Sequence, residues 1–327
     1  MKRLAILLAA LAMFAGCKNT KALLPNVSGK AGEVIVVIEK ADWEGNLGNG
    51  VRELLACDCP YLAQKEPLYT LVNVAPGGFG DLLKIHRNIV FFTINPGVDS
   101  TGVFYRHDVW ASPQCLVQVS ARNSEEAAGY IESDGKNIVS FIEQAERDRV
   151  IRNSIRYEER IIAEKVGETF GGSPHFPMGY KIKKLTPDFA WIADEKQYTI
   201  QGVLIYRYPA TGDENELTLD RIIAKRNESL KVNVPGMFEN TWMTTGVYMP
   251  PQIEFLRYRG RSFAQVRGLW EVENDFMGRP FVSHSFYSPD GEYVIVAEAF
   301  VYAPKYDKRQ YLRQVESILF SWDWNQD

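Results

Sequence analysis

Hydrophobic positions in the first third of the chain follow a mixture of strand and helix patterns. The run 33–38 is continuous, apolar and rich in β-branched residues, which predicts a buried central strand. Further strands are predicted over 68–75, 88–94, 103–110 and 115–121, and short helices over 51–55 and 79–86. The pattern therefore predicts a mixed sheet with helices.

A long helical pattern follows from Ser124. Apolar residues recur at helical spacing over 138–145 and again along one face of 151–166, so we predict a long helix that continues to Val166. Arginines at 149, 152, 156 and 160 fall on roughly the opposite face. This stripe could bind an acidic ligand, or it could be a solvated helix face. Acidic residues lie three or four positions from the arginines and would form ion pairs with them, which favours the solvated face.

The character of the chain changes after the Gly/Pro-rich segment 167–179, which predicts a linker or a domain boundary. Consecutive strands are then predicted with short turns, interrupted by helices over 218–231 and 306–320. Such strands form a largely antiparallel sheet, whose apolar face the two helices would cover. The predicted class is α+β: a mixed N-terminal sheet with helices, a long connecting helix, then a largely antiparallel sheet covered by two helices. The strands expected in this half are 180–185, 189–193, 200–208, 253–258, 263–272, 281–287 and 293–302.

The first seventeen residues have the pattern of an export signal. Met1-Lys2-Arg3 is followed by an apolar run of eleven residues and by Ala15-Gly16-Cys17. A run of this length is too short for a membrane-spanning helix, which needs ~20 residues. Residues 14–17, Phe-Ala-Gly-Cys, resemble the lipobox of bacterial lipoproteins, which implies lipidation of the Cys17 thiol and cleavage before it. The alternative is an ordinary secretory signal with a chance cysteine.

The resemblance to lipoproteins also implies an address. Lys18 follows the cysteine, and neither an acidic residue nor an acidic cluster is found there. By the sorting rules of such proteins, we expect a lipid anchor of palmitate-type chains in the outer membrane, facing the periplasm. The predicted organisation is a signal peptide at 1–16, a tether at 17–30, an N-terminal α/β part with the long helix at 31–166, and a C-terminal α+β part at 180–327.

Charge and cysteine content exclude two classes of protein. The net charge of −4 becomes −6 once Lys2 and Arg3 are removed with the signal, so the chain has no positive field for nucleic acid, and we expect no nucleic-acid partner. Three cysteines remain besides Cys17, an odd number that predicts no disulfide framework. They are Cys57, Cys59 and Cys115.

Several short motifs resemble a known family. They are Gln-Lys-Glu-Pro at 64–67, His-Arg-Asn-Ile at 86–89, Gly-Leu-Trp-Glu-Val at 268–272, Met-Gly-Arg-Pro-Phe-Val at 277–282 and Val-Tyr-Ala-Pro-Lys at 301–305. Together they resemble an uncharacterised family of Bacteroidetes lipoproteins, domain of unknown function 4837, over nearly the whole mature chain. The resemblance implies a lipoprotein and carries no activity, cofactor or catalytic residue.

Motifs for catalysis or metal binding are weak. The histidines at 86, 107, 175 and 284 lack the i, i+4 spacing of a helical metal motif, and Cys57-Asp58-Cys59 is too tight for a zinc knuckle. Gly-Gly-Ser-Pro at 171–174 has half of a nucleophile elbow, and the glycines of 77–80 favour a turn over a phosphate loop. We predict no metal, no cofactor and no catalytic residue.

Three residues are weak candidates for ligand binding. His86 and Arg87 place a titratable ring beside a cation at the end of a short helix, although a basic pair there also complements the helix dipole. Trp270 belongs to an aromatic half of the chain and could stack on a sugar or peptide, although aromatics are also common in strands.

The function predicted is a non-catalytic binding or scaffolding module of the cell envelope, held to the membrane by its lipid anchor, with an envelope protein or glycan as partner. The alternative is an envelope hydrolase acting on glycan, lipid or peptide. A deep cleft that collects a histidine, a carboxylate and a nucleophile would favour the hydrolase, and an aromatic or apolar surface would favour binding.

Overall fold

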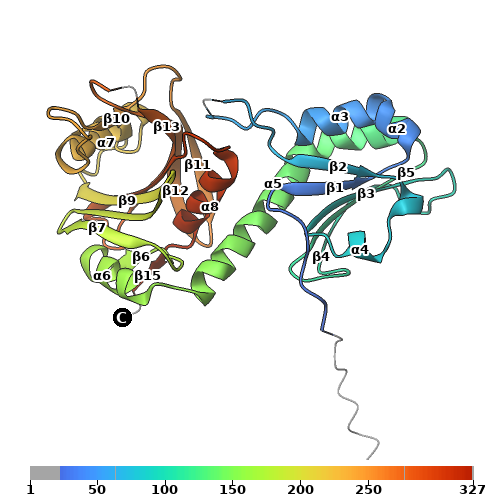
Figure 1. Ribbon diagram of the computed structural model, residues 1–327, viewed down its shortest axis with the longest axis horizontal. Helices are drawn as coiled ribbons and strands as arrows, with labels where there is room; N and C mark the ends of the chain where they lie inside the picture. Colours follow the sequence, from blue (N-terminus) through green and yellow to red (C-terminus); the bar gives the residue numbers. More distant parts are fainter. Residues whose placement is uncertain (1–22, 63, 276, 326–327) are drawn as a thin grey trace, which may run out of the picture.

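The chain folds into two bodies joined by one long helix (Figure 1). A computed structural model describes residues 23–62, 64–275 and 277–325. The predicted lipidation site Cys17 and the signal peptide 1–16 lie outside the described residues. Both bodies combine helices with a sheet, and the fold class is α+β as predicted.

The N-terminal body is built on a five-stranded sheet of order β2-β1-β3-β5-β4. Four strands run parallel and β4 is antiparallel to β5. The mixed sheet predicted from the sequence is confirmed. The strands are β1 (Glu33–Val37), β2 (Thr70–Val74), β3 (Asn88–Ile94), β4 (Gly102–His107) and β5 (Cys115–Ala121).

Both faces of this sheet are covered because its central strands are apolar throughout. Val34 and Val36 of β1 pack toward α3 (Asn46–Leu55) and the long helix α5 (Ser124–Arg156). Ile35 and Val37 face the opposite cluster, which contains Phe79 and residues of α4 (Asp81–Lys84). The remaining short helices here are α2 (Lys40–Glu44) and the 3-10 turn η1 (Pro76–Gly78).

The long helix ends ten residues earlier than the sequence predicts. Asn123 caps its start by accepting a hydrogen bond from the Glu126 backbone N–H at 2.8 Å, and the helix stops at Arg156. A separate helix, α6 (Arg160–Phe170), follows. At the break the Glu159 N–H bonds to the Phe176 carbonyl at 2.8 Å, so a tertiary contact replaces the helical hydrogen bond.

The C-terminal body is an antiparallel sheet of eight strands in the order β10-β12-β13-β14-β9-β8-β7, with β11 also paired to β12. Each pair of neighbouring strands is antiparallel, which confirms the arrangement that the sequence predicts. The strands are β7 (Lys181–Thr186), β8 (Phe189–Lys196), β9 (Thr199–Pro209), β10 (Met243–Thr245), β11 (Gln252–Tyr258), β12 (Arg261–Val272), β13 (Gly278–Tyr287) and β14 (Tyr293–Tyr302).

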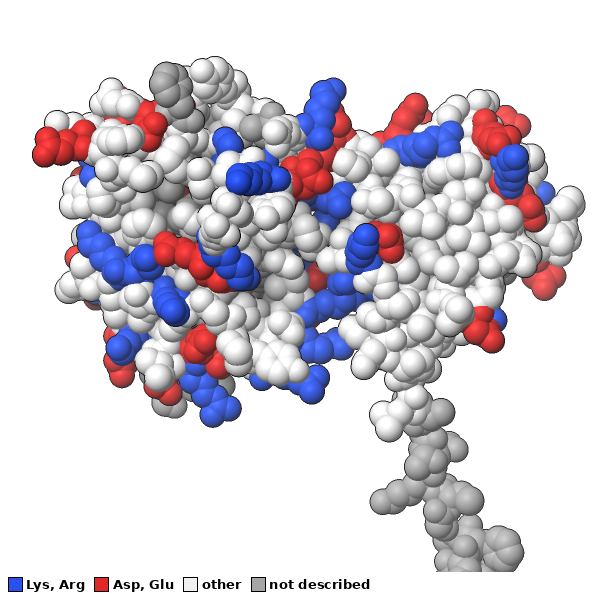
Figure 2. Space-filling view, viewed as in Figure 1, with Lys and Arg blue, Asp and Glu red and all other residues white. Residues whose placement is uncertain are grey.

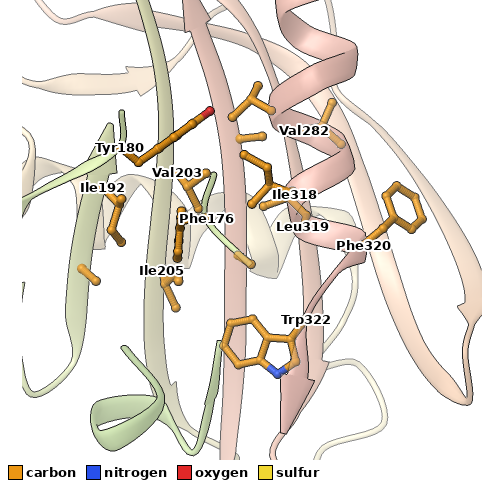
Figure 3. Packing of buried hydrophobic residues seen from close by; sticks show 14 of the residues in the cluster. Phe176, Tyr180, Ile192, Val203, Ile205, Val282, Ile318, Leu319, Phe320 and Trp322 are labelled. Carbon is orange, nitrogen blue, oxygen red and sulfur yellow. The ribbon is translucent and has the colours of Figure 1, made fainter. Parts of the chain in front are cut away.

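The two helices predicted to cover this sheet, α7 (Leu219–Asn233) and α8 (Arg309–Phe320), lie on opposite faces and not on one shared face. Helix α8 packs with Ile295 and Ala297 of β14, and Figure 3 shows its Ile318 and Leu319 among residues of the neighbouring strands. Helix α7 packs with the alternate residues, Val294 and Val296. Successive side chains of β14 point to opposite faces of the sheet, and both sets are apolar. Each face is therefore covered by a helix of its own.

A buried ion pair joins α7 to the sheet. Arg226 donates from Nε to Glu298 Oε2 at 2.8 Å and from Nη2 to Oε1 at 2.7 Å, and both side chains are fully buried. The guanidinium carbon also lies 4.0 Å from the Phe281 ring centroid. This bidentate geometry is the arrangement that compensates best for removing two charges from water.

The segment 167–179 is packed into the C-terminal body, so its prediction as an exposed linker is wrong. Phe170 ends α6, β6 (Gly172–Ser173) pairs with β15 (Asp323–Trp324), and Phe176 is fully buried. The glycines that suggested a linker have other roles. Gly171 has φ of 76° at the helix end, and a Cβ at Gly172 would lie 2.8 Å from Trp322 Nε1.

Several polar contacts hold the bodies together, and two of them are made by carboxylates of the N-terminal body. Arg313 of α8 donates to Glu143 of α5 through Nη2 at 2.6 Å and Nε at 3.2 Å. The carboxylate of Glu66, in the N-terminal body, accepts the backbone N–H groups of Lys308 and Arg309 at 2.7 and 2.8 Å. These are orphan N–H groups at the start of α8, so a residue 242 positions earlier caps this helix.

Candidate ligand-binding cleft

A cleft of about 940 Å³ opens at the end of the C-terminal sheet where β12 stops and β13 begins. One wall is the loop between β10 and β11, another is the β12–β13 turn, and Leu62 comes from the N-terminal body. In Figure 1 the loops around β10 and β13 lie at the upper edge of the C-terminal body. The described lining residues are Leu62, Gly246, Val247, Tyr248, Met249, Leu269, Trp270, Glu271, Val272, Glu273, Asn274, Asp275, Met277, Gly278 and Arg279.

Backbone hydrogen bonds fix the walls of the cleft. The Gly246 N–H bonds to the Leu269 carbonyl at 2.7 Å, and the Val272 N–H bonds to the Met277 carbonyl at 2.9 Å. Gly278 allows the two strands to approach closely, because a Cβ there would lie 2.7 Å from the Trp270 carbonyl oxygen. The cleft is therefore formed by ordered sheet ends.

Two buried N–H donors in the lining lack partners. Trp270 is 2 % exposed and packs edge-on against Phe300 at 5.9 Å between ring centroids. Its indole Nε1, and the Nε of Arg279, have no hydrogen-bond partner among the described residues. Buried donors are nearly always satisfied in folded proteins, so a ligand that brings acceptors would complete this site.

The rim of the cleft is apolar and exposed. Val247 is 82 % exposed and Tyr248 is 91 % exposed. Met237 and Phe238 are also exposed and lie on the neighbouring turn, where Asn274 Nδ2 donates to the Asn240 carbonyl at 3.3 Å. Exposed apolar side chains gathered around a concavity mark an interaction site.

The sequence-predicted site residues do not meet. Trp270 lies in the cleft, whereas His86 and Arg87 lie in the N-terminal body, just before β3. His86 Nε2 is 2.9 Å from Glu33 Oε1 and its Nδ1 is 3.0 Å from the Asn88 carbonyl oxygen. The hydrogen bond from His86 is the main cause that lowers the pKa of Glu33. These two residues are engaged within their own body, so the binding argument rests on Trp270.

The N-terminal polar cluster centres on Glu146, one of the acidic residues that the sequence places three or four positions from the arginine stripe. This carboxylate is fully buried and accepts from Asn88 Nδ2 at 2.6 Å and Arg87 Nη2 at 2.8 Å. Arg149 lies 3.2 Å from Glu146 and donates to the Arg87 carbonyl at 2.6 Å. The first arginine of the predicted stripe is therefore buried, unlike the exposed Arg152 that follows it. The signal in the sequence was the position of Glu146, a charged residue beside the apolar face of α5.

The remaining titratable candidates are dispersed. His284 is fully buried and stacks on Phe263 with ring centroids 4.2 Å apart, and burial holds its pKa well below the usual value. Burial raises the pKa of the Cys59 thiol to about 11 and that of Cys115 to about 12, whereas Cys57 is exposed. All three thiols are free. Within the described ranges, no group of three or more histidine, cysteine and acidic side chains is arranged to hold a metal ion.

Charge and hydropathy add two observations. Acidic and basic side chains are intermixed over both bodies on the face shown in Figure 2, with several Lys or Arg side chains between the bodies. No helix in the described part of the chain is long and apolar enough to span a bilayer.

Comparisons with known proteins identify both bodies. Residues 27–154 match the family described as Domain of unknown function (DUF8532), and residues 159–321 match Domain of unknown function (DUF4837). The motifs at 64–67 and 86–89 thus fall in the first of these matches. The chain has no significant match among curated proteins.

A crystal structure from Bacteroides thetaiotaomicron VPI-5482 is similar to part of the chain. It has 9 % sequence identity and a TM-score of 0.26, and the match covers 48 % of this chain and 46 % of that one, so it spans less than half of that protein. The two family matches meet at the break between α5 and α6: the C-terminal body matches the uncharacterised DUF4837 family, and a DUF8532 domain precedes it in the chain.

Proposed function

We propose that the protein is a lipid-anchored binding module of the bacterial envelope, and that its cleft holds a partner protein. One observation carries the proposal: the cleft has two buried donors, on Trp270 and Arg279, that find no partner among the described residues, and they lie beneath a rim of exposed apolar side chains. Both the apolar rim and the buried donors of such a cleft contribute to the free energy of binding. The rim buries apolar surface and the donors meet acceptors that the partner brings.

The residue types favour a protein partner. Trp270, Tyr248, Met249 and Arg279 belong to the residue types that are enriched at protein–protein interfaces and that carry most of their binding energy. Carboxylates outnumber cations in the lining, with Glu271, Glu273 and Asp275 against Arg279. The complementary partner is a segment with an apolar anchor flanked by basic residues.

Binding is favoured over hydrolysis because of what lines the cleft. Its described lining residues include carboxylates, but no histidine, serine or cysteine is among them. Acyl transfer requires a nucleophile and a base in hydrogen-bond reach, and a lipid or peptide hydrolase would need to bring both from elsewhere. The cleft as it stands is suited to holding a ligand.

The anchor is proposed from the sequence of residues 1–17. The basic start, the short apolar run and Ala15-Gly16-Cys17 support export and lipidation, with the protein held at the periplasmic face of the outer membrane. Two or three acyl chains would anchor it stably. The expected result for Cys17→Ala is loss from the membrane fraction, or an uncleaved signal. Cleaved C17A protein that still sediments with membranes would overturn the anchor.

Site-specific cross-linking in intact cells tests the cleft. A photoreactive phenylalanine analogue at Tyr248 should give one dominant protein adduct, whereas the same analogue at Ile161, 67 % exposed on α6, should give none. Tyr248→Asp should weaken binding of the identified partner by a factor of about 30 or more, as expected for a loss of ~2 kcal/mol at an interface anchor. Ile161→Asp is the matched control.

Three outcomes would contradict the proposal. Equal adducts at both positions would show that the rim is not an interface. A Tyr248→Asp variant that retains full affinity would remove the cleft from binding. Turnover of a glycan, lipid or peptide that is lost in cleft variants would establish the hydrolase instead.

A further inference from the structure

A second pocket, of about 550 Å³, lies at the opposite end of β12 from the cleft. It is bounded by the β11–β12 turn, the β13–β14 turn and the chain that leaves α8. Five of its eleven lining residues are aromatic: Tyr258, Tyr287, Phe320, Trp322 and Trp324. Its charged residues are Arg259, Arg261 and Asp323.

Arg261 is the unusual member of this pocket. Its Nη2 donates to the Leu319 carbonyl at 3.0 Å, but its Nε and Nη1 are buried and have no hydrogen-bond partner among the residues that the structure describes. The guanidinium carbon lies 4.6 Å from the Phe286 ring centroid and 5.5 Å from that of Phe263. Burial lowers the pKa of Arg261 to about 10. A buried guanidinium with so few partners is costly, and an anionic ligand would supply the missing charge.

The acidic residue of the pocket is already engaged. Asp323 Oδ2 lies 3.1 Å from His175 Nε2, and the other ring nitrogen, Nδ1, lies 2.5 Å from Glu158 Oε1. Burial lowers the pKa of His175, but its hydrogen bonds to the two carboxylates outweigh this effect and raise the pKa. The described residues offer Arg261 no carboxylate at ion-pair distance, whereas Asp323 is paired with His175. The pocket therefore retains an excess of positive charge from Arg259 and Arg261.

The aromatic walls define the body of the ligand. Trp322 and Trp324 meet edge-to-face with ring centroids 5.5 Å apart, and Trp322 Nε1 is a further buried donor that has no partner in the described part of the chain. An inorganic anion would gain nothing from aromatic walls. A pyranose ring, in contrast, has an apolar C–H face that packs on an aromatic side chain and hydroxyl groups that accept hydrogen bonds.

We propose that this pocket binds an acidic sugar, with its carboxylate directed to Arg261 and its ring against the aromatic walls. The site is separate from the partner-binding cleft and does not depend on it. Because the pocket and the cleft lie at opposite ends of one sheet, the protein can hold a glycan and a protein partner at the same time.

Calorimetry on the purified full-length protein in detergent tests the site, with sodium D-glucuronate as the probe. We expect saturable binding, accompanied by a change in tryptophan fluorescence, and at least tenfold weaker binding of D-glucose, which lacks the carboxylate, and of sodium acetate, which lacks the ring. Arg261→Met and Trp324→Ala should each weaken glucuronate binding about tenfold or more. Tyr248→Asp, in the other cleft, should leave it unchanged.

Arg259→Met serves if Arg261→Met fails to fold, because Arg259 is exposed at the rim. Glucuronate binding no tighter than glucose would overturn the charge argument. Acetate or phosphate binding as tightly as glucuronate would overturn the sugar argument. If glucuronate binding fails these tests while Tyr248 still cross-links to its partner, the sugar-binding pocket is refuted and the partner-binding cleft is not.

Discussion

Replacement of Glu66 by alanine should destabilise a helix that belongs to the other body of the protein. The Glu66 side chain is 5 % exposed, and its two oxygens accept the N–H groups of Lys308 and Arg309 at 2.7 and 2.8 Å. Glu66→Ala leaves both donors without a partner at the positive end of α8.

The magnitude follows from these two bonds. A hydrogen bond to a charged group contributes ~1.5 kcal/mol or more, which gives ~3 kcal/mol for the pair, and loss of a helix cap alone costs ~1 kcal/mol. Arg309 is only partly buried, so water would satisfy its N–H in part. We therefore expect a loss of about 2–3 kcal/mol in the free energy of unfolding. Glu66→Gln, which retains one acceptor oxygen and the shape, should lose about half of that.

Urea unfolding followed by tryptophan fluorescence measures the effect, because Trp322 and Trp324 report on the C-terminal body. Lys65→Ala is the control, since Lys65 pairs with Asp58 at the surface and such pairs contribute at most about 1 kcal/mol. A Glu66→Ala variant within ~0.5 kcal/mol of the wild type would refute the capping argument. A loss of unfolding free energy that is confined to the N-terminal body would also refute the capping argument.

Three further outcomes are expected. Arg226→Met should cost about 3–5 kcal/mol in urea unfolding because it leaves Glu298 buried without its partner, and adding Glu298→Gln should recover part of the loss; a single variant as stable as the wild type would contradict this. The folded-state pKa of His175 is raised above 6.5, so its contribution is present below pH ~6.5 and lost as pH rises through the folded value; the stability difference between wild type and His175→Gln should shrink over that range, and a constant difference would contradict it. Maleimide should label exposed Cys57 at least about tenfold faster than buried Cys115, whose pKa is raised to about 12, and equal rates would show that the buried thiol is accessible.

Interpretation of the arginine stripe shows where pattern analysis stops. Helical spacing correctly placed Arg149 near Glu146, three residues away. The spacing could not show that this pair is buried against the N-terminal sheet, because burial depends on what packs over the helix. The same holds for His86, whose neighbour Glu33 lies 53 positions away in the sequence.

The sequence by itself determined the elements whose signal is local. The apolar runs 293–302 and 33–38 predicted strands that the structure contains, and short turns predicted the antiparallel pairing of the strands in the C-terminal body. The odd number of cysteines predicted at least one free thiol or an intermolecular bridge, and the structure leaves all three thiols free. The α+β class followed from the order of these elements.

Tertiary structure alone decided the features that join distant segments. The cleft brings Leu62 to Trp270 and Arg279, and the cap of α8 comes from Glu66. No periodicity relates such positions, because their proximity depends on how the two bodies pack. Glycines at 171 and 172 predicted a linker for the same reason: the sequence indicates conformational freedom, whereas only the packed chain shows whether that freedom serves an exposed connection or a close buried contact.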